Sequence, residues 1–475
     1  MSSSLDAPLG APRTNRRSAL VVLSAAMLMT VLDGSIVTVA LPAIQRDLGF
    51  SPAGLSWTVN AYLIAFGGLL LLAGRLGDLV GRKALFLVGN AVFTVASLLA
   101  GAATTPGLLV AARFLQGVGS AMASAVVLGI LVTLFTDPAE RAGAIGVFSF
   151  TGAAGASVGQ VLGGVLTDAL SWHWIFLVNL PIGLATVLVA IRVLPADRGA
   201  GLAAGADVLG AALVTGGLML GIYTVVQVEE HGWASARTLV LGAVSVASLV
   251  AFTVRQARAR TPLMPLRILR SRNVVGANLA QVLTLSAMFA FQVLVALFMQ
   301  RVLAYGALAT GLAMLPAAVV IGGVSLFASA RLNTRFGERA VLLVGLALLA
   351  AAMVELSTVP VDADYATDLL PVMLLVTGAG LVLPALASLG MSDAKPDEAG
   401  LVSGLFNTTQ QVGMAVGVAV LSTVAAERTR RELAAGATEP VALTAGYHVA
   451  FALSATLLVA AFVVALTVPR KRATT

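Results

Sequence analysis

Long apolar stretches separated by short polar segments follow one another along almost the whole chain. The first runs from Ser18 to Leu41, 24 residues in which Asp33 carries the only charge. A helix rises about 1.5 Å per residue, so this stretch is roughly 36 Å long and can cross the hydrocarbon core of a bilayer. Further stretches lie at about 55–74, 83–103, 106–134, 142–167, 173–194, 207–228, 235–254, 273–300, 308–330, 339–358, 368–390, 400–425 and 445–468. The pattern predicts an all-α, polytopic membrane protein with fourteen transmembrane helices.

Composition supports this assignment and excludes several other classes. Hydrophobic residues make up 59% of the chain and charged residues 11%, and the mean hydropathy of +0.97 exceeds what a soluble core needs. Without cysteine there is no disulfide or thiolate metal site, and His173, His231 and His448 are too far apart in sequence to indicate a metal cluster. We expect no metal or organic cofactor. We also expect the net charge of +7 to lie in loops beside the bilayer rather than to bind nucleic acid.

The positions of the basic residues predict the orientation in the membrane. With fourteen spans both termini lie on one side, and the loops of that side hold 22 of the 29 Lys and Arg residues, against 6 on the other side. By the positive-inside rule we expect both termini in the cytoplasm and the protein in the cell (cytoplasmic) membrane. One cluster departs from the rule, because Arg428, Arg430 and Arg431 lie on the other side, flanked by Glu427 and Glu432.

An internal repeat divides the spans into two halves. Residues 75–89, RLGDLVGRKALFLVG, align without a gap on residues 331–345, RLNTRFGERAVLLVG, with seven identities at an offset of 256 residues. The copies join spans 2 and 3 and spans 10 and 11, so two six-span halves are separated by an extra pair. The expected divisions are a cytoplasmic tail at 1–17, a six-helix bundle at 18–195, an inserted pair at 196–260, a second bundle at 261–468 and a tail at 469–475. Repeated halves with a binding site between them are typical of secondary transporters.

Two opposite charges are placed inside the spans. A carboxylate in the membrane interior is costly, so Asp33 is interpreted as a proton carrier, with a capped helix kink at Gly34 as the alternative. Arg113 is the basic residue placed well inside a span, and it needs an anionic or polar partner unless it extends to the surface. We expect a direct or water-bridged interaction between Asp33 and Arg113 that changes with protonation. Gln116 is expected to complete this proton-coupling network.

Six segments together carry a resemblance to a known family. They are LDGSIVTVALP at 32–42, GRLGDLVGRK at 74–83, RFLQGVGSA at 113–121, SWHWIFLVNLPIG at 171–183, TPLMPLRILRSR at 261–272 and SGLFNTTQQVG at 403–413. In these segments the chain resembles the fourteen-span drug:proton antiporters of the major facilitator superfamily. The resemblance implies a major facilitator fold of two six-helix bundles plus two extra helices. It also implies proton-coupled efflux of drugs or antibiotics, with Asp33 as the acid of the first helix.

The segment at 74–83 is expected to be a conformational gate. Its glycines and charges are Gly74, Arg75, Gly77, Asp78, Gly81, Arg82 and Lys83. The glycines predict a tight turn between spans 2 and 3, and the charges alone also fit a simple positive-inside turn. The resemblance implies that Asp78 contacts the N-terminus of a helix from the other half and favours an outward-open state. That helix is expected to begin near Gly400, because a helix N-terminus attracts a carboxylate.

Span 5 carries a glycine pattern that favours close helix packing. The residues that form it, together with one polar residue, are Gly155, Gly159, Gln160, Gly163 and Gly164. Glycines four residues apart form a groove in which another helix approaches closely. The stretch resembles the antiporter motif of exporters, which usually has proline where Gln160 stands. Without that proline, the motif indicates neither a helix kink in span 5 nor the direction of transport.

The sequence indicates the substrate only by class. Candidates for a central cavity are the polar and aromatic residues Tyr62, Phe148, Gln281, Gln292, Asn407 and Gln411, all of which also fit helix packing. Apart from Asp33, Glu355 is the acid placed near a span interior, so we expect a small amphipathic compound that is neutral or singly charged. We expect the protein to work as a monomer and to use the proton gradient as its energy source. The alternatives are a proton-coupled carrier of an endogenous metabolite and, more weakly, a membrane enzyme, for which no nucleophile set or phosphate-binding loop is present.

Overall fold

The computed structural model describes residues 13–50, 55, 57–197, 199, 201, 207–259, 262–392, 394–395 and 398–468. This part of the chain is helical and contains no β-strand, which confirms the predicted all-α class. Thirteen of its helical segments are long and apolar enough to cross a membrane. The helix over Pro138–Ala169, α6, is 32 residues long and accounts for the remaining predicted span.

The helices of the first half and of the extra pair occupy residues 13–258. The helices of the first half are α1 (Arg13–Leu48), α3 (Trp57–Val80), α4 (Arg82–Gly101), α5 (Pro106–Leu134), α6 (Pro138–Ala169), α7 (Trp174–Leu177) and α8 (Asn179–Val193). The pair consists of α9 (Val208–His231) and α10 (Ala236–Arg258). We call the side of the bundle on which α1 begins and α18 ends the terminal side, and the opposite side the distal side.

The second half contains two spans that are broken into shorter pieces. Its elements are the 3₁₀ turn η2 (Leu266–Arg270), α11 (Arg272–Arg301), α12 (Ala307–Gly323), the π turn η3 (Val324–Ala328), α13 (Ser329–Phe336), α14 (Glu338–Leu356), the π turn η4 (Tyr365–Leu369), α15 (Leu370–Leu375), α16 (Gly378–Gly390), α17 (Ala399–Ala434) and α18 (Glu439–Thr467). Pro316 lies inside α12 and Pro384 inside α16. Each proline removes a backbone hydrogen bond from its helix.

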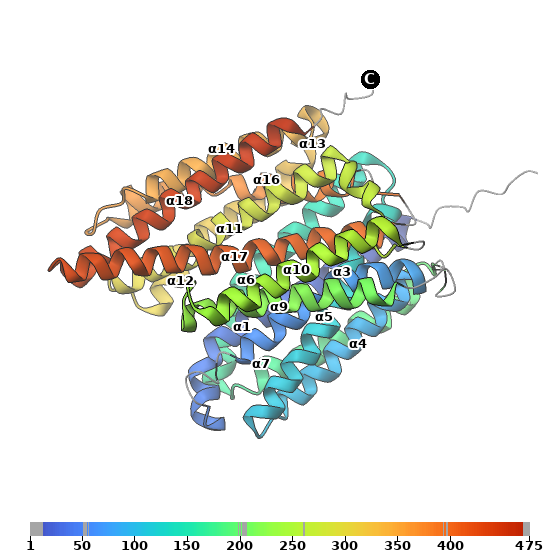
Figure 1. Ribbon diagram of the computed structural model, residues 1–475, viewed down its shortest axis with the longest axis horizontal. Coiled ribbons are helices and arrows are strands. Elements are labelled where there is room, and N and C mark those ends of the chain that lie inside the picture. Colours follow the sequence, from blue (N-terminus) through green and yellow to red (C-terminus); the bar gives the residue numbers. More distant parts are fainter. Residues whose placement is uncertain are drawn as a thin grey trace, which may run out of the picture.

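The two halves meet along α17. In Figure 1, α17 crosses the middle of the molecule, with α11, α16 and α18 on one side of it and α9, α10 and α5 on the other. Helices α3 and α5 pack against α17, and α6 packs against α12, α13 and α16. A Cβ atom on Gly74 would lie 2.5 Å from the carbonyl oxygen of Gly400, and one on Gly129 would lie 2.9 Å from that of Ala399. Backbones therefore touch on the terminal side, where no larger side chain fits.

The extra pair lies against both halves. Helix α9 packs against α3 and α17, and α10 packs against α9. A Cβ atom on Gly68 of α3 would lie 2.3 Å from Cγ of Met219 on α9. On the distal side, Trp57 and Tyr223 have ring centroids 5.8 Å apart, and Nε1 of Trp233 donates to Oγ1 of Thr423 on α17 at 3.2 Å. The pair thus bridges the boundary between the halves.

The segment at 74–83 is helical over most of its length, which corrects the expected turn. Gly74 and Gly77 lie inside α3, and only Gly81, with φ of 102°, lies between α3 and α4. A Cβ atom on Gly77 would lie 2.3 Å from Cγ1 of Val126. The two helical glycines therefore serve close packing, while Gly81 alone makes the turn because it tolerates a positive φ.

The internal repeat is visible in the conformation of matched residues. Gly337, 256 positions after Gly81, has φ of 81° and likewise precedes a helix, α14. Lys83 Nζ donates to the carbonyl oxygens of Ile191 and Leu194 at the end of α8, at 2.8 and 2.6 Å. Its counterpart Arg339 donates through Nη2 to the carbonyl oxygen of Leu466 at the end of α18, at 2.5 Å. The matched cations thus hold matched helix ends, where a positive charge is favourable.

The basic cluster that departs from the charge rule lies on an extension of α17. Arg431 Nε donates to Glu427 at 2.8 Å, and Arg430 pairs with the same carboxylate. Arg428 pairs with Glu432 at 2.5 Å, one helical turn later. Each of these arginines therefore has an acidic partner on its own helix, which offsets its charge on the distal side.

Candidate functional site

A buried ion pair lies inside the first half. Asp33 on α1 is 0% exposed and Arg113 on α5 is 1% exposed, and Nη1 of Arg113 donates to Oδ2 of Asp33. The expected contact between these two residues is therefore present. Two charges removed from water need close pairing and further hydrogen bonds, because each alone would be strongly unfavourable.

Gln116 completes the pair on α5, in the position expected for it. Its Nε2 donates to Oδ1 of Asp33 at 3.0 Å and to Oγ of Ser97 at 2.8 Å. Its Oε1 accepts from Nη1 of Arg113 at 2.9 Å. Gln116 lies one turn after Arg113, so a single face of α5 presents both groups to Asp33. The geometry fixes the guanidinium and the carboxylate in one arrangement.

Asn179, at the start of α8, is a further member that the sequence analysis missed. Its Nδ2 donates to Oδ1 of Asp33 at 3.1 Å, and the residue is fully buried. It stands within the segment 171–183, but an asparagine near a helix start has no pattern that points to α1, 146 positions earlier in the chain. The carboxylate of Asp33 thus accepts from three side chains.

The guanidinium of Arg113 has its own surroundings. Nε donates to the carbonyl oxygen of Thr58 at 2.8 Å, and the guanidinium carbon lies 4.5 Å from the ring centroid of Tyr62 and 5.8 Å from that of Phe176. The hydroxyl of Tyr62 donates to Oγ of Ser120 at 3.1 Å. Tyr62, expected in the substrate cavity, is therefore buried beside Arg113 and covers the cation with its ring.

A second set of contacts joins the halves at the terminal side. Oδ1 of Asp78 accepts from the backbone N–H of Gly400 at 2.9 Å, and Oδ2 accepts from that of Leu401 at 2.8 Å. Arg82 donates to Oδ1 of Asp78 through Nε at 3.0 Å and through Nη2 at 2.9 Å. The contact expected between Asp78 and the helix that begins near Gly400 is thus present. The first turn of α17 has unpaired N–H groups, and a carboxylate satisfies two of them.

Other residues of the segment 74–83 hold it within the first half. Asp197 accepts from the backbone N–H groups of Arg82 at 2.6 Å and of Lys83 at 3.0 Å. Asp197 lies after α8 and caps the start of α4 in this way, a role that the sequence analysis did not assign. Arg75 lies half-buried on α3. The start of α4 is therefore tied to the segment that follows α8.

The glycines of α6 face the part of α1 that carries Asp33. A Cβ atom on Gly159 would lie 2.0 Å from Oγ of Ser35, and one on Gly163 would lie 2.9 Å from the carbonyl oxygen of Ile36. A Cβ atom on Gly155 would lie 3.2 Å from Cδ1 of Leu28, and one on Gly164 would lie 4.0 Å from Cγ1 of Val39, so these two positions are less crowded. The side chain of Gln160 lies outside the described residues. Helix α6 therefore packs directly behind the part of α1 that carries the ion pair of Asp33 with Arg113.

The remaining candidates for the substrate cavity differ in burial and in their hydrogen bonds. Phe148 and Gln281 are buried, and Nε2 of Gln281 donates to the carbonyl oxygen of Phe406 at 3.1 Å. Asn407 joins the halves, because its Nδ2 donates to the carbonyl oxygen of Ser124 at 3.1 Å. Gln411 is half-buried and Gln292 is exposed.

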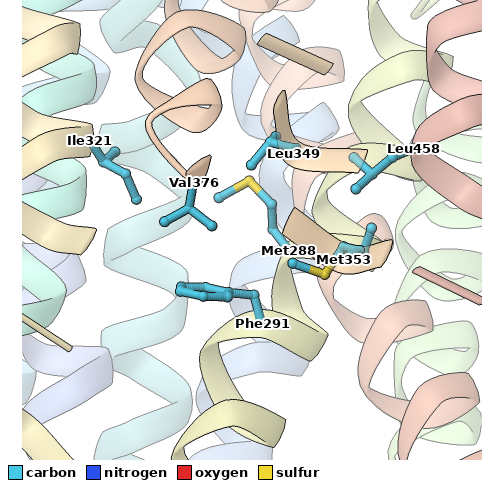
Figure 2. A pocket seen from close by; sticks show the side chains of 8 residues that line it. Met288, Phe291, Ile321, Leu349, Met353, Val376 and Leu458 are labelled. Carbon is cyan, nitrogen blue, oxygen red and sulfur yellow. The ribbon is translucent and has the colours of Figure 1, made fainter. Parts of the chain in front are cut away.

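Two cavities are formed by other residues. Figure 2 shows the first, an apolar space of about 10 Å³ beside Met288, Phe291 and Met353 in the second half, which is near the size of one water molecule. The second, of about 810 Å³, lies near the distal ends of α3 and α5 and has Trp57 and Phe114 in its wall. None of the six predicted cavity residues lines either space.

Comparison with known proteins decides the family. The family model described as "Major Facilitator Superfamily" matches residues 23–418. The chain belongs to the major facilitator superfamily. It is 39% identical over 461 residues to the puromycin resistance protein pur8 of Streptomyces alboniger, covering 94% of this chain and 91% of that protein. It is 40% identical over 431 residues to the cephamycin export protein CmcT of Amycolatopsis lactamdurans, covering 88% of each.

Solved structures of the superfamily share the fold. The human organic anion transporter MFSD10 matches with a TM-score of 0.68 and 16% identity, over 96% of this chain and 100% of that chain. The proton:xylose symporter XylE matches with a TM-score of 0.62 and 13% identity, over 93% and 95%. The major facilitator fold expected from the sequence is confirmed. The chain is a multi-pass membrane protein of a transporter superfamily.

Proposed function

We propose that this protein exports amphipathic drugs or antibiotics across the cell membrane in exchange for protons, by alternating access. The observation that carries the proposal is the carboxylate of Asp33, buried in the membrane interior and paired with Arg113. Relatives named for puromycin resistance and cephamycin export support the class of substrate and the direction. No cofactor and no enzymatic reaction are part of the proposal.

The chemistry of proton coupling follows from the surroundings of Asp33. Arg113, Gln116 and Asn179 all donate to the carboxylate oxygens of Asp33, and a charged carboxylate accepts such donors without donating itself. When a proton binds to Asp33, the attraction to Arg113 falls and the guanidinium becomes free to move. Arg113 lies on α5, which packs against α17 of the other half. Movement of Arg113 therefore transmits protonation to the boundary between the halves.

The gate at Asp78 defines the state of the transporter. Its contacts with Gly400 and Leu401 close the terminal side, where the backbones of α3 and α17 also touch. The excess of basic residues on this side supports a cytoplasmic location for it. We therefore infer that the cytoplasmic path is shut in this arrangement. Opening inward requires the capping of α17 by Asp78 to break.

The working unit is a single chain in a lipid bilayer. Both halves, the ion pair and the gate are all supplied by this chain, so the proposal needs no second copy. The substrate is a small amphipathic organic compound, and the proton gradient supplies the energy.

Transport by purified protein in proteoliposomes tests the proposal. With an imposed pH gradient, we expect puromycin or a cephamycin to move against its concentration gradient, opposite to the protons. Asp33→Asn should abolish this accumulation, while Glu355→Gln, which alters an exposed acid of α14, should leave it intact. Accumulation by Asp33→Asn at the rate of the parent protein refutes the proposal. Movement of substrate in the same direction as protons indicates a proton symporter instead of an exporter.

A further inference from the structure

Asn179 lies beside the ion pair, directly after an interruption between two helices. Helix α7 ends at Leu177 and α8 begins at Asn179, so the two short helices are separated at Val178. The side chain of Asn179 points to α1, where Nδ2 donates to Oδ1 of Asp33 at 3.1 Å. The residue is 0% exposed. Its amide is therefore held at the carboxylate.

The oxygen of this amide does not take part in a hydrogen bond within the described part of the chain. Oδ1 of Asn179 is buried and has no hydrogen-bond partner among the described residues. An unsatisfied buried acceptor costs free energy, about 1–3 kcal/mol, and calls for an explanation. An amide can donate through its nitrogen and accept through its oxygen, and rotation about its last bond exchanges the two. Asn179 can therefore meet either a hydrogen-bond acceptor or a donor at the same place.

Protonation turns Asp33 from an acceptor into a donor. The neutral carboxyl has one O–H, which needs an acceptor once it is buried. Arg113 cannot accept, because a guanidinium has donors only. Gln116 already uses Oε1 for Arg113 and Nε2 for Asp33 and Ser97. Among the three side chains that donate to Asp33, Asn179 is the one with a free oxygen.

The other groups around the site do not replace Asn179. Tyr62 on α3 faces Arg113 and donates to Ser120. Oγ1 of Thr58 is also buried without a partner among the described residues, but the contact of Thr58 to the site is through its carbonyl oxygen, which accepts from Arg113. Among the described residues, Arg113 is therefore the charged group that faces Asp33, and Gln116 and Asn179 are its neutral neighbours.

We propose that Asn179 is a positioning residue for proton binding, which donates to the charged Asp33 and, after its amide rotates, accepts from the protonated Asp33. The inference rests on the proposed proton coupling at Asp33. The step is balanced: one proton from the outside binds to a carboxylate oxygen, the O–H then donates to Oδ1 of Asn179, and Arg113 keeps its charge. Asn179 thereby allows Asp33 to be buried in both protonation states.

Two transport assays on the same variants test this role. Asn179→Leu has a similar volume but neither donor nor acceptor, and we expect it to lower pH-gradient-driven accumulation about tenfold or more. Substrate counterflow, an exchange without net proton movement, should stay within about twofold of the parent protein. Asn179→Thr replaces the amide with a hydroxyl, which both donates and accepts, and should keep part of the proton-driven rate. If the role of Asn179 were only structural, Asn179→Leu would lower the rates of proton-driven accumulation and of counterflow together.

The matched control is another buried asparagine of the first half. Asn90 on α4 donates through Nδ2 to the carbonyl oxygen of Phe86 on its own helix, at 2.8 Å. Asn90→Leu should not change the ratio of proton-driven transport to counterflow. Equal losses in the two assays for Asn179→Leu, or no loss in either, overturn the inference. If Asp33→Asn loses coupling while Asn179→Leu keeps it, only the role of Asn179 fails; if Asp33→Asn keeps coupling, the proposed function fails.

Discussion

The carboxylate of Asp78 caps the first turn of α17 across the boundary between the halves. It accepts from the backbone N–H of Gly400, 322 positions later in the chain, at 2.9 Å. Gly400 has no room for a side chain, because a Cβ atom would lie 2.6 Å from Oδ1 of Asp78 and 2.7 Å from the carbonyl oxygen of Gly74. The gate therefore depends on a charge from one half and a bare backbone from the other.

Gly400→Ala should weaken the closed gate without changing a charge. The added methyl group separates α3 from α17, so we expect a single cysteine placed at the buried position Ser403 to be labelled about tenfold faster from the terminal side. The chain has no native cysteine, so the label reports one position. Gly311→Ala, where a Cβ atom meets nothing within 4 Å, is the control. Equal labelling of both variants contradicts this account of the gate.

Gly159→Ala should separate α6 from the part of α1 that carries Asp33. A Cβ atom would lie 2.0 Å from Oγ of Ser35 and 2.9 Å from the carbonyl oxygen of Leu32. Because backbone must move, we expect a loss of about 1–3 kcal/mol of stability, measured as a lower melting temperature in detergent. Gly164→Ala adds the same methyl group 4.0 Å from Val39 and should have little effect. Equal melting temperatures for the two variants contradict close packing at Gly159.

Trp172→Phe should open the surroundings of Asp33 and Arg113 to the distal side. Nε1 of Trp172 donates to Oδ2 of Asp47 at 2.8 Å, and this bond holds the segment before α7 against the end of α1. Ala40, two turns beyond Asp33 on α1, is 0% exposed and packs in the same apolar cluster as Trp172. We expect a cysteine at position 40 to react about tenfold faster with a polar thiol reagent in Trp172→Phe.

Trp174→Phe provides the control for that experiment. Trp174 is two residues away, in α7 itself, and is 46% exposed. Trp174→Phe should therefore leave the rate of labelling at position 40 unchanged. If both variants raise the labelling rate equally, the bond between Trp172 and Asp47 has no special part in closing the distal side.

The terminal-side end of the extra pair should lose stability in acid. Burial alone raises the pKa of Asp207, but hydrogen bonds from Gly210, Arg255 and Gln256 outweigh it and hold the pKa below its ordinary value. A carboxylate with a lowered pKa contributes stability above the unfolded pKa of about 4 and loses it as the pH falls through the folded pKa. Asp207→Asn should therefore destabilise the protein at pH 7 by about 1–3 kcal/mol, seen as a lower melting temperature. The difference from the parent protein should become smaller as the pH falls below about 4.

The control for Asp207 is an exposed acid. Asp362 lies in the loop after α14, and Asp362→Asn should leave the melting temperature unchanged at both pH values. A destabilisation by Asp207→Asn that is the same at pH 7 and pH 3 would show that the charge of Asp207 is not the cause.

Charge placement predicted part of the site because a buried charge is costly wherever it occurs. Asp33 and Arg113 stand out in apolar runs, and each requires the other, so their contact could be expected from the sequence. Asp78 and Gly400 were connected through the family resemblance rather than through physics alone. Uncharged polar residues carry no comparable cost, and the predicted cavity residues, such as Gln281 and Gln292, are accordingly found bonded to backbone in one case and exposed in the other.

The sequence by itself determined the spans, the two halves with their extra pair, and the pair of opposite charges, because these depend on hydrophobic length, on repeated residues and on the cost of burying charge. Only the tertiary structure decided that Asn179 reaches Asp33, that Gly74 and Gly77 are packing residues within α3, and that α9 lies against both halves. These contacts depend on how each helix is rotated about its axis and on which backbones approach closely. A short-range pattern in the sequence does not encode either quantity.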